Sequence, residues 1–248
     1  MNLNFQITAS SRVGCVRTNN EDMVLIGNHL LRNGKYSYAS QPKDSRLLLA
    51  LADGMGGHNC GEVASEDTIH NLQYYFEDMP EHLDEKGLRE SMENWLRSIS
   101  LIINAKGCES PMYRNMGTTL VGMLCYEDEY YWFNCGDSRL YRLHGDKFEQ
   151  LTTDHSLSQA MGLSTHSSQI TNCIGGGTTE CFIDMERITD FVQPGDIFML
   201  CSDGLTDMIN DDEIKRLLAM GFDADALCEA AEDAGGYDNV SVVVIKVE

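Results

Sequence analysis

Several features are missing from this 248-residue chain, and each absence narrows its class. No apolar run approaches the roughly 20 residues that span a bilayer, and residues 1–15 lack the apolar centre of a signal peptide. Basic residues are few: Lys+Arg is 18 against 39 for Asp+Glu, and the formal net charge is −21. Nucleic acid and an anionic membrane surface would both repel such a chain, so neither is expected as a partner.

The nine cysteines contain no C-x-x-C pair and no His/Cys cluster with zinc spacing. An odd number of thiols also does not suit a complete disulfide framework. Cys125, Cys135 and Cys201 fall inside expected strands, where a thiol behaves as a small hydrophobic group. We therefore expect a soluble protein of the reducing cytoplasm.

The length predicts a single domain over residues 1–248, which would bury roughly three quarters of its unfolded surface. The clearest helix is expected over Glu85–Asn104, where apolar residues recur at three- and four-residue steps. Further helices are expected at Glu62–Phe76, Ser156–Met161, Asp211–Met220 and Asp223–Ala234.

Short strands joined by turn residues fill the rest and predict antiparallel sheet. The first strands are expected as a pair within Leu3–Val16 and as Met23–Gly27, followed by a long polar hairpin connection over Asn28–Ser45. The others are expected at Arg46–Ala52, Thr118–Tyr126, Tyr130–Cys135, Arg139–Leu143, Lys147–Leu151, Cys181–Arg187, Asp196–Cys201 and Val240–Val247. The last is apolar on both faces, which is typical of a central strand.

Two apolar runs end in an Asp-Gly pair, Asp53–Gly54 and Asp203–Gly204. A buried strand that ends in this way delivers a carboxylate to the surface, and the glycines let the backbone come close to whatever the carboxylate holds. Taken singly, each pair is explained by an ordinary turn.

Five acids end strands or open loops: Asp22, Asp53, Asp137, Asp203 and Asp238. All but Asp22 have a small, turn-compatible neighbour. Together the five acids form the oxygen-only ligand set that Mg²⁺ and Mn²⁺ prefer. Carboxylates gathered without a cation would repel one another, which favours a metal site over a set of unrelated turns.

The motifs around these acids resemble those of a known family, and they occur in the family's order over nearly the whole chain. They are VRTNNED at Val16–Asp22, ADGMGGHNCGEVAS at Ala52–Ser65, GTTL at Gly117–Leu120, NCGDSRLY at Asn134–Tyr141, LTTDHS at Leu151–Ser156, LCSDGLTD at Leu200–Asp207 and GGYDNVSVVVI at Gly235–Ile245. The family is that of the metal-dependent (PPM) type 2C protein Ser/Thr phosphatases, in their bacterial form.

The resemblance implies an α/β (α+β) fold, a central sandwich of two antiparallel sheets flanked on both sides by pairs of helices. It implies a Mg²⁺- or Mn²⁺-dependent phosphatase that hydrolyses phosphoserine and phosphothreonine in proteins through water activated by two ions. A monomer acting on a cytosolic Ser/Thr kinase or that kinase's substrates would fit the habit of the family. Two alternatives stay open, a catalytically silent module that binds phosphoproteins and a phosphatase of small phosphorylated molecules.

The resemblance also implies residue roles. Asp53 would bridge two ions, Gly54 would contribute its carbonyl to one, and Asp203 and Asp238 would hold the other. Asp22 would act from the edge, with Glu21 further out, and Asp137 would join Asp203 in holding a third, weaker ion. Arg17 is placed to clamp the phosphoryl oxygens; its alternative is a surface arginine paired with Glu21.

Two departures from the family pattern affect these roles. Met55 stands where many eukaryotic members carry a proton-donating histidine, so the general acid is left to His58 or to a metal-bound water. The alternative for His58 is a structural role beside the glycine turn. In the stretch Asp154–Thr179, which includes the family's flap, the chain is short, Asn172 replaces a basic residue, and the glycines from Gly175 would add mobility. Substrate choice is therefore the property that transfers least.

Overall fold

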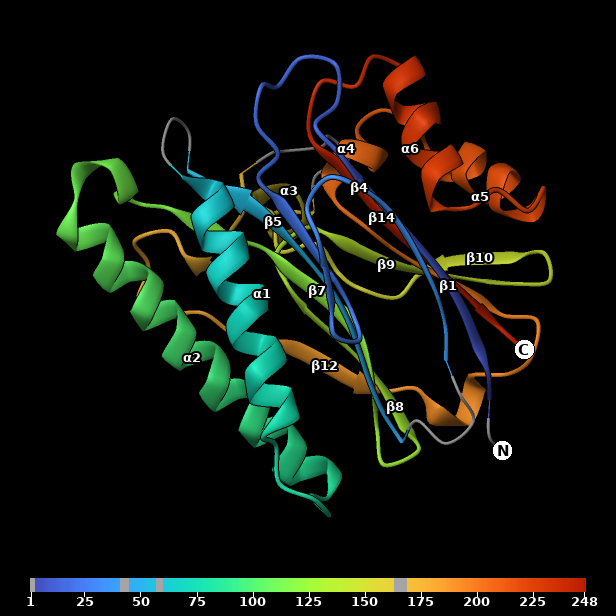
Figure 1. Cartoon of the computed structure of the whole chain (residues 1–248), viewed down its shortest axis with the longest axis horizontal. Helices are drawn as coiled ribbons and strands as arrows, with labels where there is room; N and C mark the ends of the chain where they lie inside the picture. Colours follow the sequence, from blue (N-terminus) through green and yellow to red (C-terminus); the bar gives the residue numbers. More distant parts are fainter. Residues whose placement is uncertain (1–2, 41–44, 57–59, 163–168) are drawn as a thin grey trace.

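The computed structural model describes residues 3–40, 45–56, 60–162 and 169–248 (Figure 1). Within them the strands form two sheets, and every strand pair is antiparallel. The six-stranded sheet contains, in spatial order, β10 (Lys147–Gln150), β9 (Arg139–His144), β13 (Ile197–Cys201), β14 (Val240–Val247), β1 (Phe5–Arg12) and β4 (Gly34–Ala39). The eight-stranded sheet contains β11 (Ile174–Gly175), β6 (Gly117–Thr118), β5 (Arg46–Met55), β7 (Leu120–Tyr126), β8 (Glu129–Cys135) and β12 (Asp184–Arg187), with β2 (Asp22–Ile26) on β5 and β3 (His29–Leu31) on β2.

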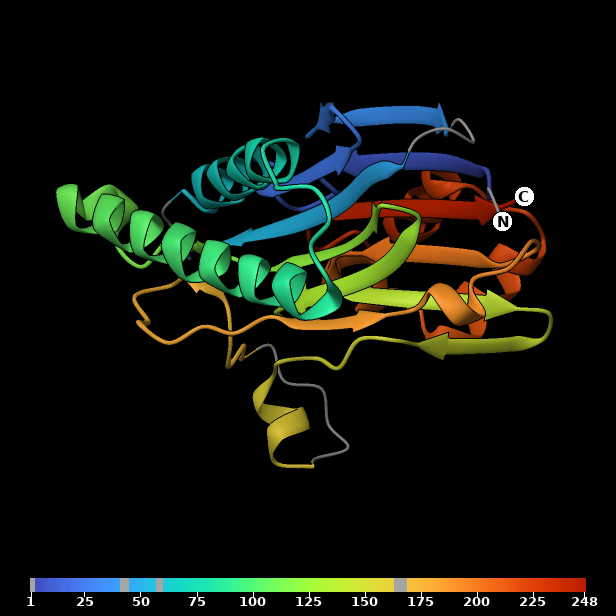
Figure 2. The same cartoon turned by 90° about the horizontal axis from the view of Figure 1, so that it is seen from below.

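Helices cover the outer face of each sheet (Figures 1 and 2). The long helices α1 (Gly61–Glu77) and α2 (Glu85–Glu109) pack on the eight-stranded sheet, and α5 (Asp211–Ala219) and α6 (Ala224–Asp233) pack on the six-stranded one. Shorter helical turns are α3 (Leu157–Ala160), α4 (Asp203–Thr206), η1 (Pro111–Tyr113) and η2 (Thr189–Phe191). The layers run helix, sheet, sheet, helix, so the predicted fold class is confirmed. No helix in the described ranges is both long and apolar enough to cross a membrane.

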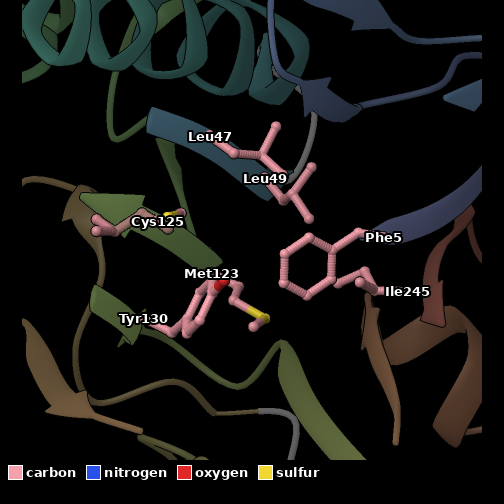
Figure 3. Close-up of a pocket in the computed structure, with 8 residues that line it drawn as sticks. Phe5, Leu47, Leu49, Met123, Cys125, Tyr130 and Ile245 are labelled. Atoms are coloured by element: carbon pink, nitrogen blue, oxygen red, sulfur yellow. The ribbon is translucent and has the colours of Figure 1, made fainter. Parts of the chain in front are cut away.

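The central position predicted for the last strand is also confirmed. β14 lies between β13 and β1, with Val243 and Ile245 facing the layer between the sheets and Val242 and Val244 facing α5 and α6. Side chains from both sheets meet in that inner layer (Figure 3). The ring of Phe5 there lies 5.5 Å from that of Tyr130, edge to face. The gap that remains between these side chains is only about 10 Å³, roughly the space of one water molecule, so this layer is packed core.

Two predictions for the N-terminal part were wrong. Leu3–Val16 contributes one strand, β1, because its partners come from elsewhere in the chain: β14 on one side and β4 on the other. The polar stretch Asn28–Ser45 is not only a connection, since it contains β3 and β4. β4 is an edge strand with alternating half-buried and exposed positions, a pattern too polar to stand out in the sequence.

Several boundaries also differ from the expected ones. The helix α2 runs on to Glu109, and β12 begins at Asp184 instead of Cys181. β5 continues through Asp53 to Met55, so this acid lies inside a strand rather than after it. The turn of helix α4 was not predicted, and it begins at Asp203. Both of the last two differences place an expected metal ligand on regular backbone, whose hydrogen bonds fix its position.

Candidate active site

The strand register brings the first two acids together. In the antiparallel pair β2–β5, Asp22 lies directly opposite Asp53. Residues opposite each other in such a pair have Cβ atoms about 4.5–5.5 Å apart when they share a face, close enough for two carboxylates to interact. Like charges at such a pair are destabilising, so this register needs a compensating positive charge.

The other three acids lie at the same ends of three neighbouring strands of the six-stranded sheet, β9, β13 and β14. Cys201, at the end of β13, pairs with Arg139 at the start of β9 and with Val242 near the start of β14. Asp203 follows the first of these strands by two residues, while Asp137 and Asp238 precede the other two. Antiparallel neighbours therefore deliver all three acids to the same end of the sandwich.

A cavity of about 480 Å³ opens at this end. Four of the five acids line it, together with Arg17, Glu21 and the backbone of Gly54: these acids are Asp53, Asp137, Asp203 and Asp238. Asp22 is fully buried behind the cavity wall. The structure thus brings Arg17 and all the acids expected to hold metal together in one place.

Glycine is needed where β5 meets the start of α1. A Cβ on Gly54 would lie 2.2 Å from the carbonyl oxygen of Gly61 and 2.6 Å from that of Glu21. A Cβ on Gly61 would lie 2.6 Å from the carbonyl carbon of Gly54. No side chain fits at either position, so the strand and the helix touch backbone to backbone. This contact sets the floor of the cavity beside Asp53.

Polar residues that the sequence did not single out hold the acids in place. Thr119 brackets the backbone of Asp53: its N–H donates to the Asp53 carbonyl at 2.9 Å, and its Oγ1 accepts from the Asp53 N–H at 3.0 Å. Ser202 Oγ donates to Asp22 Oδ2 at 2.9 Å. These residues sit inside the family-like motifs, but their types alone gave no signal of this role.

Asn239 fastens the loop that carries Arg17 and Glu21 to the site. Its Oδ1 accepts from the Glu21 N–H at 2.8 Å, and its Nδ2 donates to the carbonyls of Val13 at 2.9 Å and Asn19 at 2.8 Å. The residue next to Asp238 therefore positions the opposite wall of the cavity.

Burial and mutual repulsion raise the pKa of the acids. The pKa of Asp203 rises to about 8, through desolvation and then repulsion from Asp137, and that of Asp22 rises to about 6, mainly through desolvation. For Asp53, desolvation and repulsion from Asp22 and the other acids raise the pKa well above its usual value. A bound cation would favour the ionised carboxylates and so counteract this rise in pKa.

The donor set fits hard divalent cations. It consists of carboxylate and carbonyl oxygens, and Asp22 Oδ1 is a buried carboxylate oxygen without a hydrogen-bond partner among the described atoms. No three His, Cys, Asp or Glu side chains of the described ranges converge tightly enough to enclose one ion by themselves.

Arg17 does not pair with Glu21, as its alternative interpretation required. Its Nη2 donates to Asp238 Oδ2 at 2.7 Å, and both side chains are partly exposed at the cavity rim. This ion pair raises the pKa of the Arg17 guanidinium. The arginine therefore stands beside one of the expected metal ligands, with its remaining donors available to an anion.

The far wall of the cavity is built by Ile170, Cys173 and Gly176. Asn172 is buried, and its amide nitrogen is engaged by protein groups instead of an anion. Its Nδ2 lies 2.8 Å from His155 Nδ1 and donates to the Phe182 carbonyl at 2.8 Å. Asn172 thus fixes the position of this segment. It does not supply the positive charge of the basic residue that the family carries there.

Met55 lines the cavity and carries no proton to donate. His58, the other candidate for the general acid, lies outside the described residues.

An acidic, oxygen-lined pocket at one end of a four-layer sandwich is typical of hydrolases that work with divalent cations. Residues 31–233 match the family described as Protein phosphatase 2C. The chain belongs to the protein phosphatase 2C family.

Individual relatives cover almost the whole chain. The protein phosphatase PhpP of Streptococcus pneumoniae is 31% identical over 258 residues, which covers 98% of this chain and 97% of PhpP. Among solved structures, the serine/threonine phosphatase of S. agalactiae superposes with a TM-score of 0.82 at 27% identity, over 98% of this chain and 100% of that one. The catalytic domain of the serine/threonine phosphatase PstP, in complex with two manganese ions, gives a TM-score of 0.76 at 34% identity, over 99% of each chain.

The raised pKa values predict that metal-free protein loses stability as the pH rises. Asp203 has a pKa of about 8 when folded and an ordinary low pKa when unfolded, so between about pH 4 and pH 8 the folded state binds more protons. The free energy of unfolding then falls with rising pH over that range. We expect the Tm measured in chelator to drop by several degrees from pH 5.5 to pH 8, and Mn²⁺ to restore more at pH 8. A Tm in chelator that climbs over this range would contradict the electrostatic account.

Proposed function

We propose that this chain is a Mg²⁺- or Mn²⁺-dependent protein serine/threonine phosphatase that hydrolyses phosphoserine and phosphothreonine. The observation that carries the proposal is the convergence of four acids on one open cavity, with Asp22 buried opposite Asp53 and Arg17 at the rim. The four acids are Asp53, Asp137, Asp203 and Asp238. Family membership and the names of the relatives support the same activity.

We assign the metal-holding roles to the acids in the pattern that the sequence suggested. Asp53 would be shared between two ions, with the Gly54 carbonyl turned to one of them. Asp203 and Asp238 would hold the second ion, and Asp22 would support the site from its buried position. Asp137 beside Asp203 would hold a third, weaker ion. PstP binds two manganese ions in its solved structure, which supports the choice of cofactor.

When bound, such ions lower the pKa of the water they bind to about 7, and they offset the negative charge of the phosphoryl group. The chain's own residues supply position. Arg17 would bind phosphoryl oxygens through the donors that Asp238 leaves free, which orients the phosphorus toward the cavity floor. Thr119 and the contact of Gly54 with Gly61 keep Asp53 in place, so that the acid does not need to reorganise during the reaction.

The substrate class and setting follow from the same site. Phosphorylated Ser/Thr proteins are the expected substrates, and a cytosolic Ser/Thr kinase or its targets would be a fitting partner. All nine cysteines are free thiols, which supports a reducing cytoplasmic setting. We further infer that residues 1–248 act as one catalytic domain and as a monomer; the pairing of β1 with β14 joins the two ends of the chain in one sheet.

The test is phosphate release from matched phosphoserine, phosphothreonine and phosphotyrosine peptides across a Mn²⁺ titration. We expect release from the phosphoserine and phosphothreonine peptides that rises with Mn²⁺, stops in chelator and returns when Mn²⁺ is restored. Saturable peptide binding without release would instead select the silent module. Faster release from small phosphorylated metabolites would select the phosphatase of small phosphorylated molecules, and release that ignores chelator would rule out the metal-dependent mechanism.

A further inference from the structure

A second cavity of about 620 Å³ lies beside the catalytic pocket. It is formed where the C-terminal end of α2 and the turn η1 meet the segment 177–179, and we call it the α2 groove. Figures 1 and 2 show this end of α2 reaching past α1 at the edge of the molecule. The groove is lined by Leu101, Ile103, Pro111, Arg114, Met116 and Thr179, among others. Its volume falls within the range of about 300–1,000 Å³ that is usual for ligand sites.

The α2 groove and the catalytic pocket share a wall. Asn115 lines both cavities, and of two consecutive glycines Gly176 lines the catalytic pocket while Gly177 lines the groove. Asn104 of α2 fixes this wall: its Oδ1 accepts from the Gly177 N–H at 2.9 Å, and its Nδ2 donates to the Thr178 carbonyl at 2.6 Å. A chain that leaves the catalytic pocket over Asn115 therefore enters the groove directly.

The chemistry of the groove is opposite to that of the pocket. Its surface is mainly apolar, and Leu101 is 60% exposed although it is a large aliphatic residue. Arg114 is exposed, and no ion pair of its side chain occurs among the described residues. Most other basic side chains in the described ranges pair with an acid, as in Arg97–Glu93 and Lys106–Asp67. Apolar surface beside an unpaired cation is complementary to a segment that carries a large apolar residue next to an acidic one.

We propose that the α2 groove is a specificity site that binds the residues flanking the phosphoserine or phosphothreonine on one side of the substrate chain. A large apolar side chain of the substrate lies against the exposed Leu101 and Pro111, and an adjoining acidic residue faces Arg114. The inference rests on the proposed function and deepens it. The occupant is the substrate itself, because the groove adjoins, across Asn115, the pocket that must hold the phosphorylated residue.

The test compares phosphothreonine peptides that differ only in the flanking residues. The parent peptide carries alanine around the phosphothreonine, and a series moves one leucine through the positions up to about four residues on each side. We expect leucine to raise kcat/KM at least about fivefold at one or two neighbouring positions on one side only, as partial burial of an aliphatic side chain would. A glutamate next to that leucine should raise kcat/KM further. Arg114→Ala should remove the gain from the glutamate and leave the gain from the leucine.

Leu101→Ser should reduce the leucine preference to about the level of the alanine peptide. Hydrolysis of p-nitrophenyl phosphate, which has no flanking chain, should stay within about twofold for both variants. Ile102→Ser is the matched control: this neighbour on α2 is also exposed and aliphatic, but it does not line the groove. It should leave the preference intact.

Equal rates on leucine and alanine peptides, or equal losses in Leu101→Ser and Ile102→Ser, would overturn the inference and leave the proposed function standing. Hydrolysis of p-nitrophenyl phosphate without hydrolysis of any phosphopeptide would overturn both. The two failures are thus distinguishable in one set of assays.

Discussion

Asp53→Asn is expected to lower kcat/KM by on the order of 10³-fold or more at saturating Mn²⁺. The substitution keeps the shape of the side chain and removes the charge that two ions would share. Each 1.36 kcal/mol of lost transition-state stabilisation costs about tenfold in rate, and metal ions supply several kcal/mol of it. Phosphate release from a phosphothreonine peptide and from p-nitrophenyl phosphate measures the loss, which should be similar for both substrates.

The same variant should become more stable when metal is absent. Burial, and then repulsion from Asp22 and the other acids, raises the pKa of Asp53, so a neutral amide removes a cost that the carboxylate imposes on the folded state. We therefore expect Asp53→Asn to have a higher Tm than the unmodified chain in chelator at pH 8, and a smaller gain on adding Mn²⁺.

Asp212→Asn is the control for this pair of effects, because Asp212 is exposed near the start of α5, outside the cavity. It should change neither activity nor the response to metal. An active Asp53→Asn would contradict the metal-holding role. Loss of activity together with a lower Tm in chelator would point to a structural defect in its place.

The sequence predicted well those elements that bury a whole face, or both faces, because such burial imposes a regular hydrophobic pattern. β14 is apolar throughout because it has a packed layer on each face, and α2 repeats its apolar residues because one stripe contacts the sheet. β4 was missed because an edge strand has little burial to impose a pattern, and its partner, β1, is distant in sequence. Pairing over such distances is decided by tertiary contacts, which local propensity does not contain.

Four of the acids could be found from the sequence because each has a small or turn-compatible neighbour, which is a local signal; Asp22, between Glu21 and Met23, has none. Their arrangement could not be derived locally. The register that sets Asp22 opposite Asp53 depends on the pairing of two strands, and the partner of Arg17 lies 221 residues away in the chain. The family resemblance supplied this long-range information. It did not supply the α2 groove, whose residues lie mainly outside the matching motifs.

Two roles of Arg17, binding of phosphoryl oxygens and positioning of Asp238, lead to different kinetic results. Arg17→Ala should lower kcat/KM by about 10²-fold, mostly through KM, if the guanidinium binds phosphoryl oxygens, since charge-assisted hydrogen bonds contribute about 1.5–3 kcal/mol. The inhibition constant of inorganic phosphate should rise with it, because the product carries the same oxygens. Steady-state kinetics with added phosphate measures both.

If Arg17 instead serves only to hold Asp238, the loss should appear in the Mn²⁺ concentration needed for half-maximal activity and vanish at saturating Mn²⁺. Arg17→Lys separates charge from geometry: it keeps the positive charge but not the forked donors, so partial recovery of phosphate affinity is expected. Arg97→Ala, an exposed arginine on α2 that pairs with Glu93, should have no effect on either quantity. An unchanged inhibition constant for phosphate in Arg17→Ala would remove this residue from substrate binding, and the anion would then be held by the metal ions alone.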